Sequence, residues 1–437
     1  MTITFSTLFH SITRFQAIAL TSAPRRLARA GAPCYNGEMI GISKLYCGTV
    51  EPSDVLRYDN RSLPSHLLQF SADKKPVVVW NVTRACNLAC GHCYAEADPG
   101  PAPDELTRAE ALRLADHLIE YGVPVILFSG GEPLLHPNIF ELIGRAVRGG
   151  VRAVLSTNGL MIDREKAARL ADLGLSYAGV SLDGLEKTHD ELRGRPGLFT
   201  LTLKAIDAAR AAGLKVGLRL TLTRRNLSEL GALFDLLERE DLPRICFYHL
   251  VSSGRGRHLS QWALSRAETR GAVDLIAGRT EEMFGRGRSP EVLTVDNHAD
   301  GPWLYLKKKR AGEARRAADI LELLRLNGGN SSGHGLGAVS WDGQVHPDQF
   351  WRSVRLGSVR ERDFSEIWND PANAFLQALK NKKDHVTGRC RACAFLDACG
   401  GNLRARAEAA TGDPWGEDPA CYLTDEEISI TLPGKRP

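Results

Sequence analysis

Short apolar runs alternate with longer amphipathic runs over residues 76–250 of this 437-residue chain. The short runs have the length of strands, and the longer ones repeat apolar residues at helical spacing. Regular alternation of strands and helices predicts parallel pairing with right-handed crossovers. The expected strands are 77–82, 123–129, 151–156, 177–182, 215–222 and 244–250, and the expected helices are 107–121, 137–148, 163–173, 199–212 and 227–239. Six such units predict an α/β fold, a partial (β/α)6 TIM-like barrel over residues 76–257.

The remainder of the chain has a different pattern. Residues 258–335 are mostly helical in character, interrupted at 292–301, and form a predicted bridging region. Its basic run 307–310 is expected to be a solvated helix face. Apolar residues on both sides of an Asp-Gly pair predict a hairpin over 336–346, and a helix near 364–381 follows. Residues 336–437 are therefore expected to form a C-terminal α+β domain.

The first 38 residues have an unusual composition. They contain no acidic residue before Glu38 and are rich in Ser, Thr and Arg, which is typical of a transit peptide. The simpler interpretation, which we favour, is that Met39 is the natural start. We therefore expect 1–38 to be disordered or not native, and 39–75 to form a separate N-terminal segment.

Composition narrows the class of protein. A formal net charge of +4 is too small to indicate nucleic-acid binding. No apolar run reaches membrane-spanning length, so no transmembrane helix is expected. Ten cysteines are many for a protein that is not secreted, and their spacing suggests metal binding more than disulfides. These features predict an oxygen-sensitive cytoplasmic protein.

Two groups of cysteines are candidate metal ligands. Cys86, Cys90 and Cys93 follow the first expected strand on one loop. Three thiolates at this spacing can hold three irons of a [4Fe–4S] cluster and leave the fourth iron open, whereas a zinc knuckle would need a fourth ligand nearby. The second group suits either structural zinc or an iron–sulfur cluster, and consists of Cys390, Cys393, Cys399 and Cys421.

Polar clusters follow the other expected strands. In barrels of this kind, chemistry is located at the carboxyl ends of the strands. Each cluster alone is a weak signal, because Gly-Gly and Asn-Gly are common in turns. Five such clusters, each at the end of an expected strand, nevertheless indicate one active site on this rim of the barrel. The clusters are Ser129–Pro133, Ser156–Gly159, Ser181–Gly184, Arg219 with Thr221, and Tyr248 with His249.

The spacing C-x3-C-x2-C, followed by Gly-Gly-Glu after the second strand, resembles the radical S-adenosyl-L-methionine (SAM) enzymes, and the resemblance covers nearly the whole chain from Met39. It implies that Cys86, Cys90 and Cys93 hold a [4Fe–4S] cluster whose open iron binds SAM, with His92 at the usual aromatic position. It also implies an electron-donor protein of the flavodoxin or ferredoxin type. The SAM-binding residues that it implies are Gly130, Gly131, Glu132, Ser156, Asn158, Ser181, Asp183 and Arg193.

The C-terminal cysteines resemble those of SPASM/Twitch domains, which hold auxiliary clusters. A SPASM domain with two clusters carries more cysteines than the four grouped here. The resemblance therefore implies one auxiliary [4Fe–4S] cluster, held by Cys390, Cys393, Cys399 and Cys421.

Further stretches resemble one branch of these enzymes, the 12,18-didecarboxysiroheme deacetylases (AhbC-type) and the related haem d1 enzymes (NirJ-type). These stretches are 39–54, 296–301, 327–332, 346–351 and 412–415. The resemblance implies loss of two acetate side chains from 12,18-didecarboxysiroheme, giving Fe-coproporphyrin III by way of a 5′-deoxyadenosyl radical. The alternatives are haem d1 biosynthesis, peptide modification, and a non-catalytic iron–sulfur or haem carrier. The intact Gly130-Gly131-Glu132 argues against the carrier.

A flat, polyanionic tetrapyrrole would need aromatic, cationic and iron-binding partners. Candidates for stacking are Trp303, Tyr305, Phe350 and Trp351. Candidates for carboxylate binding are Arg219, Arg255, Arg257 and Arg352. Candidates for the substrate iron are His298, His334 and His346. Core packing is the simpler explanation for any one of these aromatic residues or histidines, and His298 and His346 are retained as candidate catalytic residues.

Overall fold

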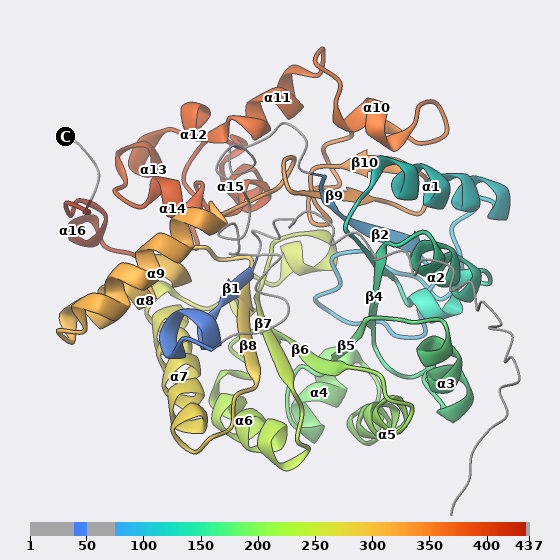
Figure 1. Cartoon of the computed structure of the whole chain (residues 1–437), viewed down its shortest axis with the longest axis horizontal. Coiled ribbons are helices and arrows are strands. Elements are labelled where there is room, and N and C mark those ends of the chain that lie inside the picture. Colours follow the sequence, from blue (N-terminus) through green and yellow to red (C-terminus); the bar gives the residue numbers. More distant parts are fainter. Residues whose placement is uncertain (1–38, 50–74, 434–437) are drawn as a thin grey trace, which may run out of the picture. The chain divides into compact units, whose positions relative to one another are not determined.

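The structure, a computed structural model, describes residues 39–49 and 75–433 (Figure 1). All of these residues belong to one unit, Pro33–Pro437. The expectation for residues 1–38 lies outside the described residues, as does most of the expectation for 39–75.

Six parallel strands form the centre of the sheet and pair in the order of the sequence. They are β2 (Val77–Thr83), β3 (Val125–Gly130), β4 (Arg152–Thr157), β5 (Tyr177–Ser181), β6 (Val216–Leu222) and β7 (Arg244–His249). All six correspond to predicted strands, and the predicted partial barrel is confirmed.

The sheet extends beyond these six strands at both edges. Next to β7 lies β8 (Glu291–Val295), which runs parallel to it, and β1 (Met39–Gly41) pairs antiparallel with β8. Next to β2 lie β9 (Leu336–Val339), β10 (Gln344–His346) and β11 (Gly357–Ser358). The predicted hairpin is confirmed as β9 and β10. The interruption expected at 292–301 is present, and its first part belongs to β8, a fully buried strand that continues the barrel sheet.

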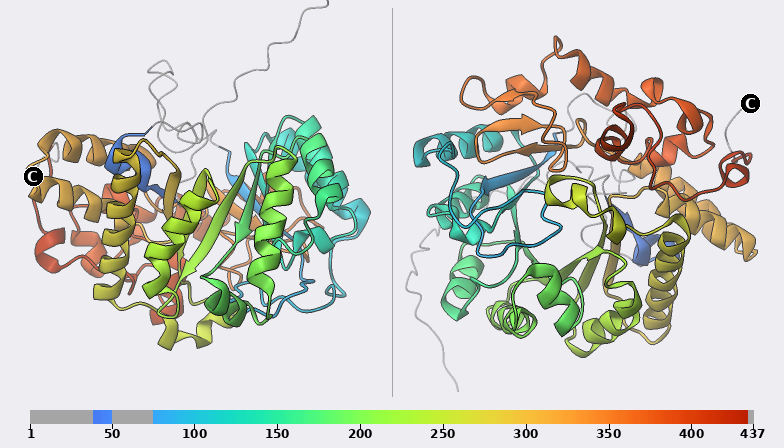
Figure 2. Two further views of the ribbon diagram at one scale, coloured as in Figure 1. Left: turned by 90° about the horizontal axis from the view of Figure 1, so that it is seen from below. Right: turned by 180° about the vertical axis from the view of Figure 1, so that it is seen from behind.

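Helices cover the outer face of the parallel strands (Figures 1 and 2). They are α1 (Arg108–Tyr121), α2 (Ile139–Arg148), α3 (Arg164–Asp172), α4 (Glu186–Arg193), α5 (Leu198–Ala211), α6 (Leu230–Arg239) and α7 (Arg266–Gly285). Of these, α4 has no counterpart among the predicted helices. Thr107 begins α1 with a capping box, because its side chain accepts from the Glu110 amide while the Glu110 carboxylate accepts from the Thr107 amide.

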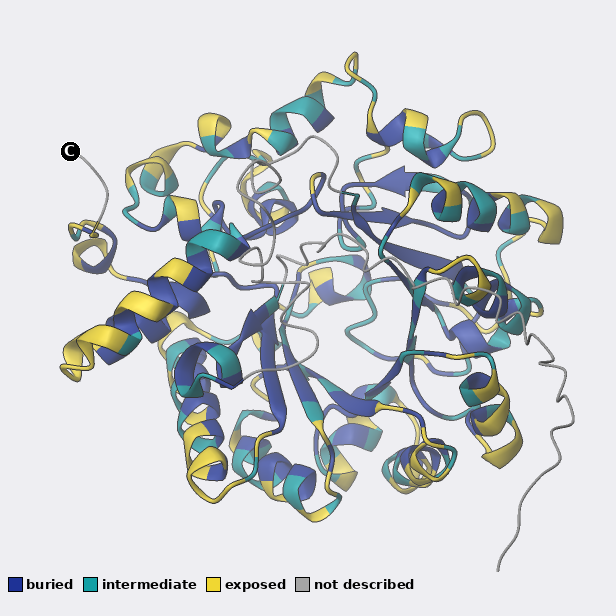
Figure 3. Cartoon of the chain, in the orientation of Figure 1, coloured by how far each residue is buried: buried dark blue, intermediate teal, exposed yellow. Residues whose placement is uncertain are grey.

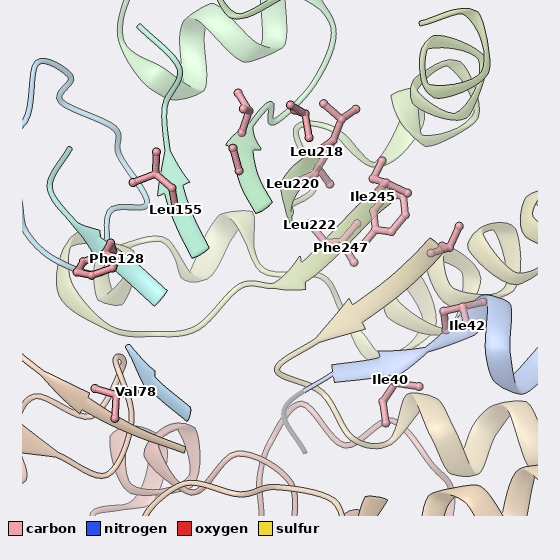
Figure 4. Packing of buried hydrophobic residues seen from close by; sticks show 14 of the residues in the cluster. Ile40, Ile42, Val78, Phe128, Leu155, Leu218, Leu220, Leu222, Ile245 and Phe247 are labelled. Carbon is pink, nitrogen blue, oxygen red and sulfur yellow. The ribbon is translucent and has the colours of Figure 1, made fainter. Parts of the chain in front are cut away.

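Side chains of β6 alternate between the two faces of the sheet, as a strand requires. Leu218, Leu220 and Leu222 are buried in the hydrophobic core between sheet and helices (Figure 4). Arg219 and Thr221 lie between them in sequence and line a cavity inside the barrel. The same division is visible in Figure 3, where strands and inner helix faces are buried and outer helix faces are exposed. The barrel interior can therefore carry polar groups without interrupting the core.

The chain after the barrel is largely helical. It contains α8 (Asp300–Arg310), α9 (Ala314–Asn327), α10 (Phe364–Trp368), α11 (Ala374–Lys380), α12 (Lys382–His385), α13 (Gly388–Ala392), α14 (Leu396–Cys399), α15 (Arg404–Thr411) and α16 (Asp425–Ile428). The single helix predicted near 364–381 is wrong, because Pro371 and its neighbours separate α10 from α11. Among the described residues, no helix is long and apolar enough to cross a membrane.

The basic run at the end of α8 is only partly the solvated face that its charge predicts, because Lys309 and Arg310 are exposed whereas Lys308 is buried. Lys308 is 4% exposed, and its ammonium group donates to Glu281 at 2.8 Å and Glu313 at 3.0 Å. Lys307 donates to Asp274 at 2.6 Å. The cations in this part of α8 therefore tie the helix to its neighbours.

Candidate functional site

A cavity opens at the carboxyl ends of the parallel strands, where the sequence predicts the active rim. About 1080 Å³ in and around it is free of protein atoms, part of this open to solvent. Cys86, Cys90 and Cys93 all line it, together with residues from the ends of β3 to β7. The predicted rim clusters and the first cysteine group therefore meet at one site.

The cysteine loop lies directly against the turn after β3. The amides of Gly131 and Glu132 donate to the carbonyls of Thr83 at 2.8 Å and Ala85 at 2.7 Å. A Cβ atom at Gly131 would stand 2.2 Å from the Ala85 carbonyl oxygen. Glycine is therefore required at 131 for the two loops to approach each other.

Glu132 is fully buried and satisfied by protein donors. Its carboxylate accepts from Thr157 Oγ1 at 2.7 Å, the Asn158 amide at 2.8 Å and the Leu134 amide at 3.2 Å. Burial raises the pKa of Glu132 to about 7, although these hydrogen bonds act to lower it. The Asn158 side chain in turn donates to Asn87 at 2.7 Å and lies 3.9 Å from the Cys86 sulfur. Glu132 thus supports Asn158 beside the cysteine loop and does not itself line the cavity.

A second buried carboxylate, Asp183, supports the opposite end of the cysteine loop. It accepts from Arg193 Nε at 2.6 Å and lies 3.1 Å from His92 Nε2. Burial acts to raise the pKa of Asp183, but the charges of Arg193 and His92 hold it well below its usual range. Arg193 Nη1 lies 3.7 Å from the Cys90 sulfur, so a fixed positive charge stands beside this thiol. Arg193 is at the end of α4, the helix missing from the predictions.

The four C-terminal cysteines line a second cavity. Cys390 is on α13, Cys399 is on α14, and Cys393 and Cys421 lie in adjoining loops. In the described part of the chain, no three His, Cys, Asp or Glu side chains are arranged to hold one bare metal ion; these four thiols instead surround a space. Burial raises the pKa of Cys393 to about 11 and that of Cys399 well above its ordinary value. The donor set fits a cluster in which each thiolate binds a different iron.

Comparison with known proteins identifies the family. Residues 80–237 match the radical SAM superfamily, and residues 334–394 match SPASM, an iron–sulfur cluster-binding domain. The chain is 55% identical over 395 residues to Fe-coproporphyrin III synthase of Methanosarcina barkeri, which covers 89% of this chain and 99% of that protein. This chain belongs to the radical SAM superfamily.

Other radical SAM proteins extend the comparison. The chain is 41% identical over 355 residues to pre-heme d1 synthase of Dinoroseobacter shibae, covering 81% of this chain and 87% of that protein. The structure of Streptococcus suis SuiB bound to S-adenosylmethionine has a TM-score of 0.62 and 18% identity, covering 80% and 78% of the two chains. That likeness shows the shared fold. The predicted cofactors, [4Fe–4S] clusters and SAM, are confirmed for the family. The match to an iron–sulfur domain favours a cluster over structural zinc for the C-terminal cysteines.

The structure separates the predicted SAM-binding residues into two sets. Gly130, Gly131, Ser156, Asn158, Ser181 and Arg193 line the cavity of this radical SAM barrel. Glu132 and Asp183 lie behind Asn158 and Arg193 and hold them by hydrogen bonds.

The predicted substrate-binding arginines have different surroundings. Arg255 donates to the carbonyls of Cys90 at 2.9 Å and Ala97 at 2.8 Å, so it anchors the cysteine loop. Arg257 donates to Glu96, and Arg352 lies over the Trp341 ring at 4.3 Å. Of the four, Arg219 and Arg255 line the cavity. Unlike Arg255, Arg219 forms no hydrogen bond or ion pair with the residues that the structure describes.

Most of the predicted aromatic and histidine ligands lie away from the cavity. Phe350 lines it, whereas the other three aromatic candidates, Trp303, Tyr305 and Trp351, are buried in the core. Both ring nitrogens of His346 are engaged, at 2.8 Å from Ser340 Oγ and 2.7 Å from the Val354 carbonyl. His298 is fully buried and does not line the cavity, and His334 is exposed. The geometry favours a packing role for His346 over iron binding.

Tyr94 is a cavity residue that sequence reasoning missed. Its hydroxyl donates to Asn81 at 2.9 Å and lies 3.0 Å from Ser129 Oγ, and its ring meets Phe350 edge-on at 5.2 Å. Its place directly after Cys93 is the only signal in the sequence. Tyr94 therefore joins the cysteine loop to the Phe350 side of the cavity.

Proposed function

We propose that this chain is an Fe-coproporphyrin III synthase, which removes two acetate side chains from 12,18-didecarboxysiroheme. The observation that carries the proposal is its 55% identity to the Methanosarcina barkeri enzyme across 99% of that protein. An alignment of 395 residues spans most of this chain and nearly all of that protein, and so supports a common substrate as well as a common fold.

Cys86, Cys90 and Cys93 are the proposed ligands of the SAM-binding [4Fe–4S] cluster, because all three line one cavity. The auxiliary [4Fe–4S] cluster is assigned to the four thiols of the second cavity, Cys390, Cys393, Cys399 and Cys421. When bound, the first cluster and SAM supply a 5′-deoxyadenosyl radical by one-electron cleavage of a C–S bond.

The protein's part in this reaction is to bind SAM and the substrate and to orient them toward each other. Ser156, Asn158 and Ser181 offer polar groups to SAM on the cavity wall. Glu132 and Asp183 are positioning residues, since they fix Asn158 and Arg193 beside the cysteine loop. An apolar cluster lies in the barrel and consists of Val77, Val79, Val125, Leu336 and Ala338, of which Val79 also lines the cavity. Partners held in fixed positions favour one reactive geometry.

In this proposal, a partner protein of the flavodoxin or ferredoxin type supplies the electron required for SAM cleavage. The reaction takes place in the cytoplasm. Ten cysteines, of which seven form the two proposed cluster sites, support a reducing compartment. The substrate is a tetrapyrrole small molecule.

Haem d1 biosynthesis is the second candidate, supported by the 41% identity to pre-heme d1 synthase. Anaerobic incubation with 12,18-didecarboxysiroheme, SAM and a strong reductant, followed by mass spectrometry, separates the two. Loss of both acetates identifies Fe-coproporphyrin III formation. A different tetrapyrrole product from the same substrate would favour the haem d1 branch.

A further inference from the structure

Arg219 extends from β6 into the barrel, and its neighbours are arranged to hold it there. A Cβ atom at Gly179, on the adjacent strand β5, would stand 2.6 Å from Arg219 Cδ. On the other side, the guanidinium carbon lies 4.6 Å from the centre of the Tyr248 ring. Strand β5 therefore leaves room for the aliphatic part of Arg219, and Tyr248 on β7 supports its charged end.

Arg219 forms no hydrogen bond or ion pair with the residues that the structure describes. A guanidinium group stays protonated at any physiological pH. Two other arginines of the barrel have anionic partners: Arg244 lies 2.6 Å from Glu291, and Arg193 lies 2.6 Å from Asp183. No described carboxylate pairs with Arg219, although it lines the cavity. A cation withdrawn from water without a partner is unfavourable, so this position is suited to an anion from a ligand.

We propose that Arg219 binds a carboxylate of the tetrapyrrole substrate. This inference rests on the proposed function. The planar guanidinium can donate two parallel hydrogen bonds to a carboxylate, which fixes orientation as well as charge. Tyr94 and Phe350 line the same cavity and offer ring surfaces to a flat molecule.

The carboxylate of SAM has the same chemistry, and the structure favours the substrate over it. Arg193 already stands 3.7 Å from the Cys90 sulfur, at the loop proposed to hold the SAM-binding cluster. The groups around Arg219 are instead Tyr248, Cys246, Tyr177 and Tyr94. Arg193 is thus the cation next to the cluster loop, and Arg219 borders the aromatic part of the cavity.

The test compares Arg219→Gln with the wild-type enzyme, both loaded with clusters and kept anaerobic. Affinities are measured by spectral titration with Fe-coproporphyrin III and with its fully amidated derivative, in which every carboxylate is neutral. We expect wild type to prefer the acid, and Arg219→Gln to lose about tenfold to hundredfold in affinity for the acid alone, as for a lost charge-assisted pair. Formation of 5′-deoxyadenosine without substrate is measured in the same samples, as a separate readout of SAM binding.

Two further variants separate the role of the charge from effects on folding. Gly179→Ala keeps the arginine but displaces its side chain, and should reduce the preference for the acid in the same direction. Arg257→Gln removes an exposed arginine outside the cavity and should leave the preference intact. Iron content and circular dichroism confirm that each variant is folded.

The outcomes distinguish this inference from the proposed function. An unchanged acid preference in Arg219→Gln would overturn the role of Arg219 while leaving the proposed function in place. Loss of substrate-independent SAM cleavage in folded, iron-loaded Arg219→Gln would indicate that Arg219 binds SAM. That result would also overturn its proposed role in substrate binding. A wild-type enzyme that binds neither form would contradict the inference and the proposed function together.

Discussion

The cysteines of both sites are buried or half-buried, and one thiol at each site has an arginine beside it. Burial raises the pKa of Cys86 to about 12 and also raises that of Cys90, on which the nearby Arg193 acts in the opposite direction. Arg389 Nη1 lies 3.6 Å from the Cys421 sulfur in the second cavity. Only thiolates bind iron, so cluster assembly must release protons from these groups. The neighbouring arginines favour the anionic form that a cluster requires.

The two cysteine groups should lose iron separately. Cys393→Ser removes one thiol of the second cavity, and the iron content should fall by about four per chain, as expected for one cube. Formation of 5′-deoxyadenosine in the absence of substrate should continue, because the first cavity is unchanged. Iron analysis and chromatography after anaerobic reconstitution measure both.

Cys47→Ser is the matched control, since Cys47 lies in neither cavity. It should keep the full iron content. If Cys393→Ser also kept its iron, the assignment of the second cluster to these thiols would be wrong.

At the scale of elements, the site depends on two loops that touch through backbone atoms. The loop after β2 carries the cysteines, and the turn after β3 carries Gly130 and Gly131. Gly130 has a φ of 133°, and a Cβ atom there would stand 2.4 Å from the Thr83 carbonyl oxygen. The two glycines therefore set the distance between the cysteine loop and the rest of the rim.

Gly131→Ala should displace the cysteine loop, because its Cβ atom would meet backbone that cannot rotate away. A displacement near 1 Å at a reacting centre reduces rates by about 100-fold, and SAM cleavage should fall on this order. Gly231→Ala is the control, since Gly231 is on α6 with open space around its Cβ position. It should preserve cleavage and raise the free energy of unfolding by up to about 1 kcal/mol. Equal cleavage by both variants would show that the close approach has no part in catalysis.

The sequence predicted those elements whose signals are local. Strands β2 to β7 follow from apolar runs of strand length, and the rim follows from polar residues in phase at their ends. Strand β8 was missed because its five residues lie between helical stretches, and its pairing with β7 and β1 joins distant parts of the chain. Helix α4 was missed because it is short and has only two buried residues, His189 and Leu192.

The candidate site was predictable to a similar extent. Cysteine spacing located both cavities, since it is a property of the sequence alone. The choice among four candidate arginines was not predictable, because it depends on partners such as Glu96 that lie far from them in sequence. For the same reason the sequence could not show that Glu132 and Asp183 stand behind the residues that line the cavity.

On the scale of the molecule, buried polar groups join the C-terminal segment to the barrel. His249, at the end of β7, lies 2.8 Å from Asp300, and Asp300 accepts from the Tyr422 hydroxyl at 2.8 Å. Tyr422 directly follows Cys421, one of the thiols of the second cavity. Asp300 therefore connects the end of the barrel strand to the backbone that carries this thiol.

Glu427, on α16, is a second such connection and should make stability sensitive to acid. Burial acts to raise its pKa, but donors from Arg270, the Thr424 amide and Arg310 lower it to about 2. A carboxylate with a lowered pKa stabilises the fold fully above its unfolded value near 4.5, and this contribution is lost as the pH falls towards 2. Glu427→Gln should lower the free energy of unfolding at pH 7 by about 2 kcal/mol.

Urea denaturation of the cluster-loaded protein under anaerobic conditions measures this effect. The difference between Glu427→Gln and wild type should shrink as the pH is lowered below about 4. Glu361→Gln, at an exposed glutamate, should match wild type at each pH. A difference that stays constant with pH would show that Glu427 acts through packing and not through its charge.

The central claim is that this radical SAM protein removes two acetates from a tetrapyrrole. It is tested most directly by the mass of the tetrapyrrole after anaerobic incubation of the cluster-loaded enzyme with 12,18-didecarboxysiroheme, SAM and reductant. Conversion to Fe-coproporphyrin III, with 5′-deoxyadenosine formed alongside and both absent for Cys90→Ser, is the predicted result. Formation of 5′-deoxyadenosine while the tetrapyrrole keeps both acetates would contradict the account.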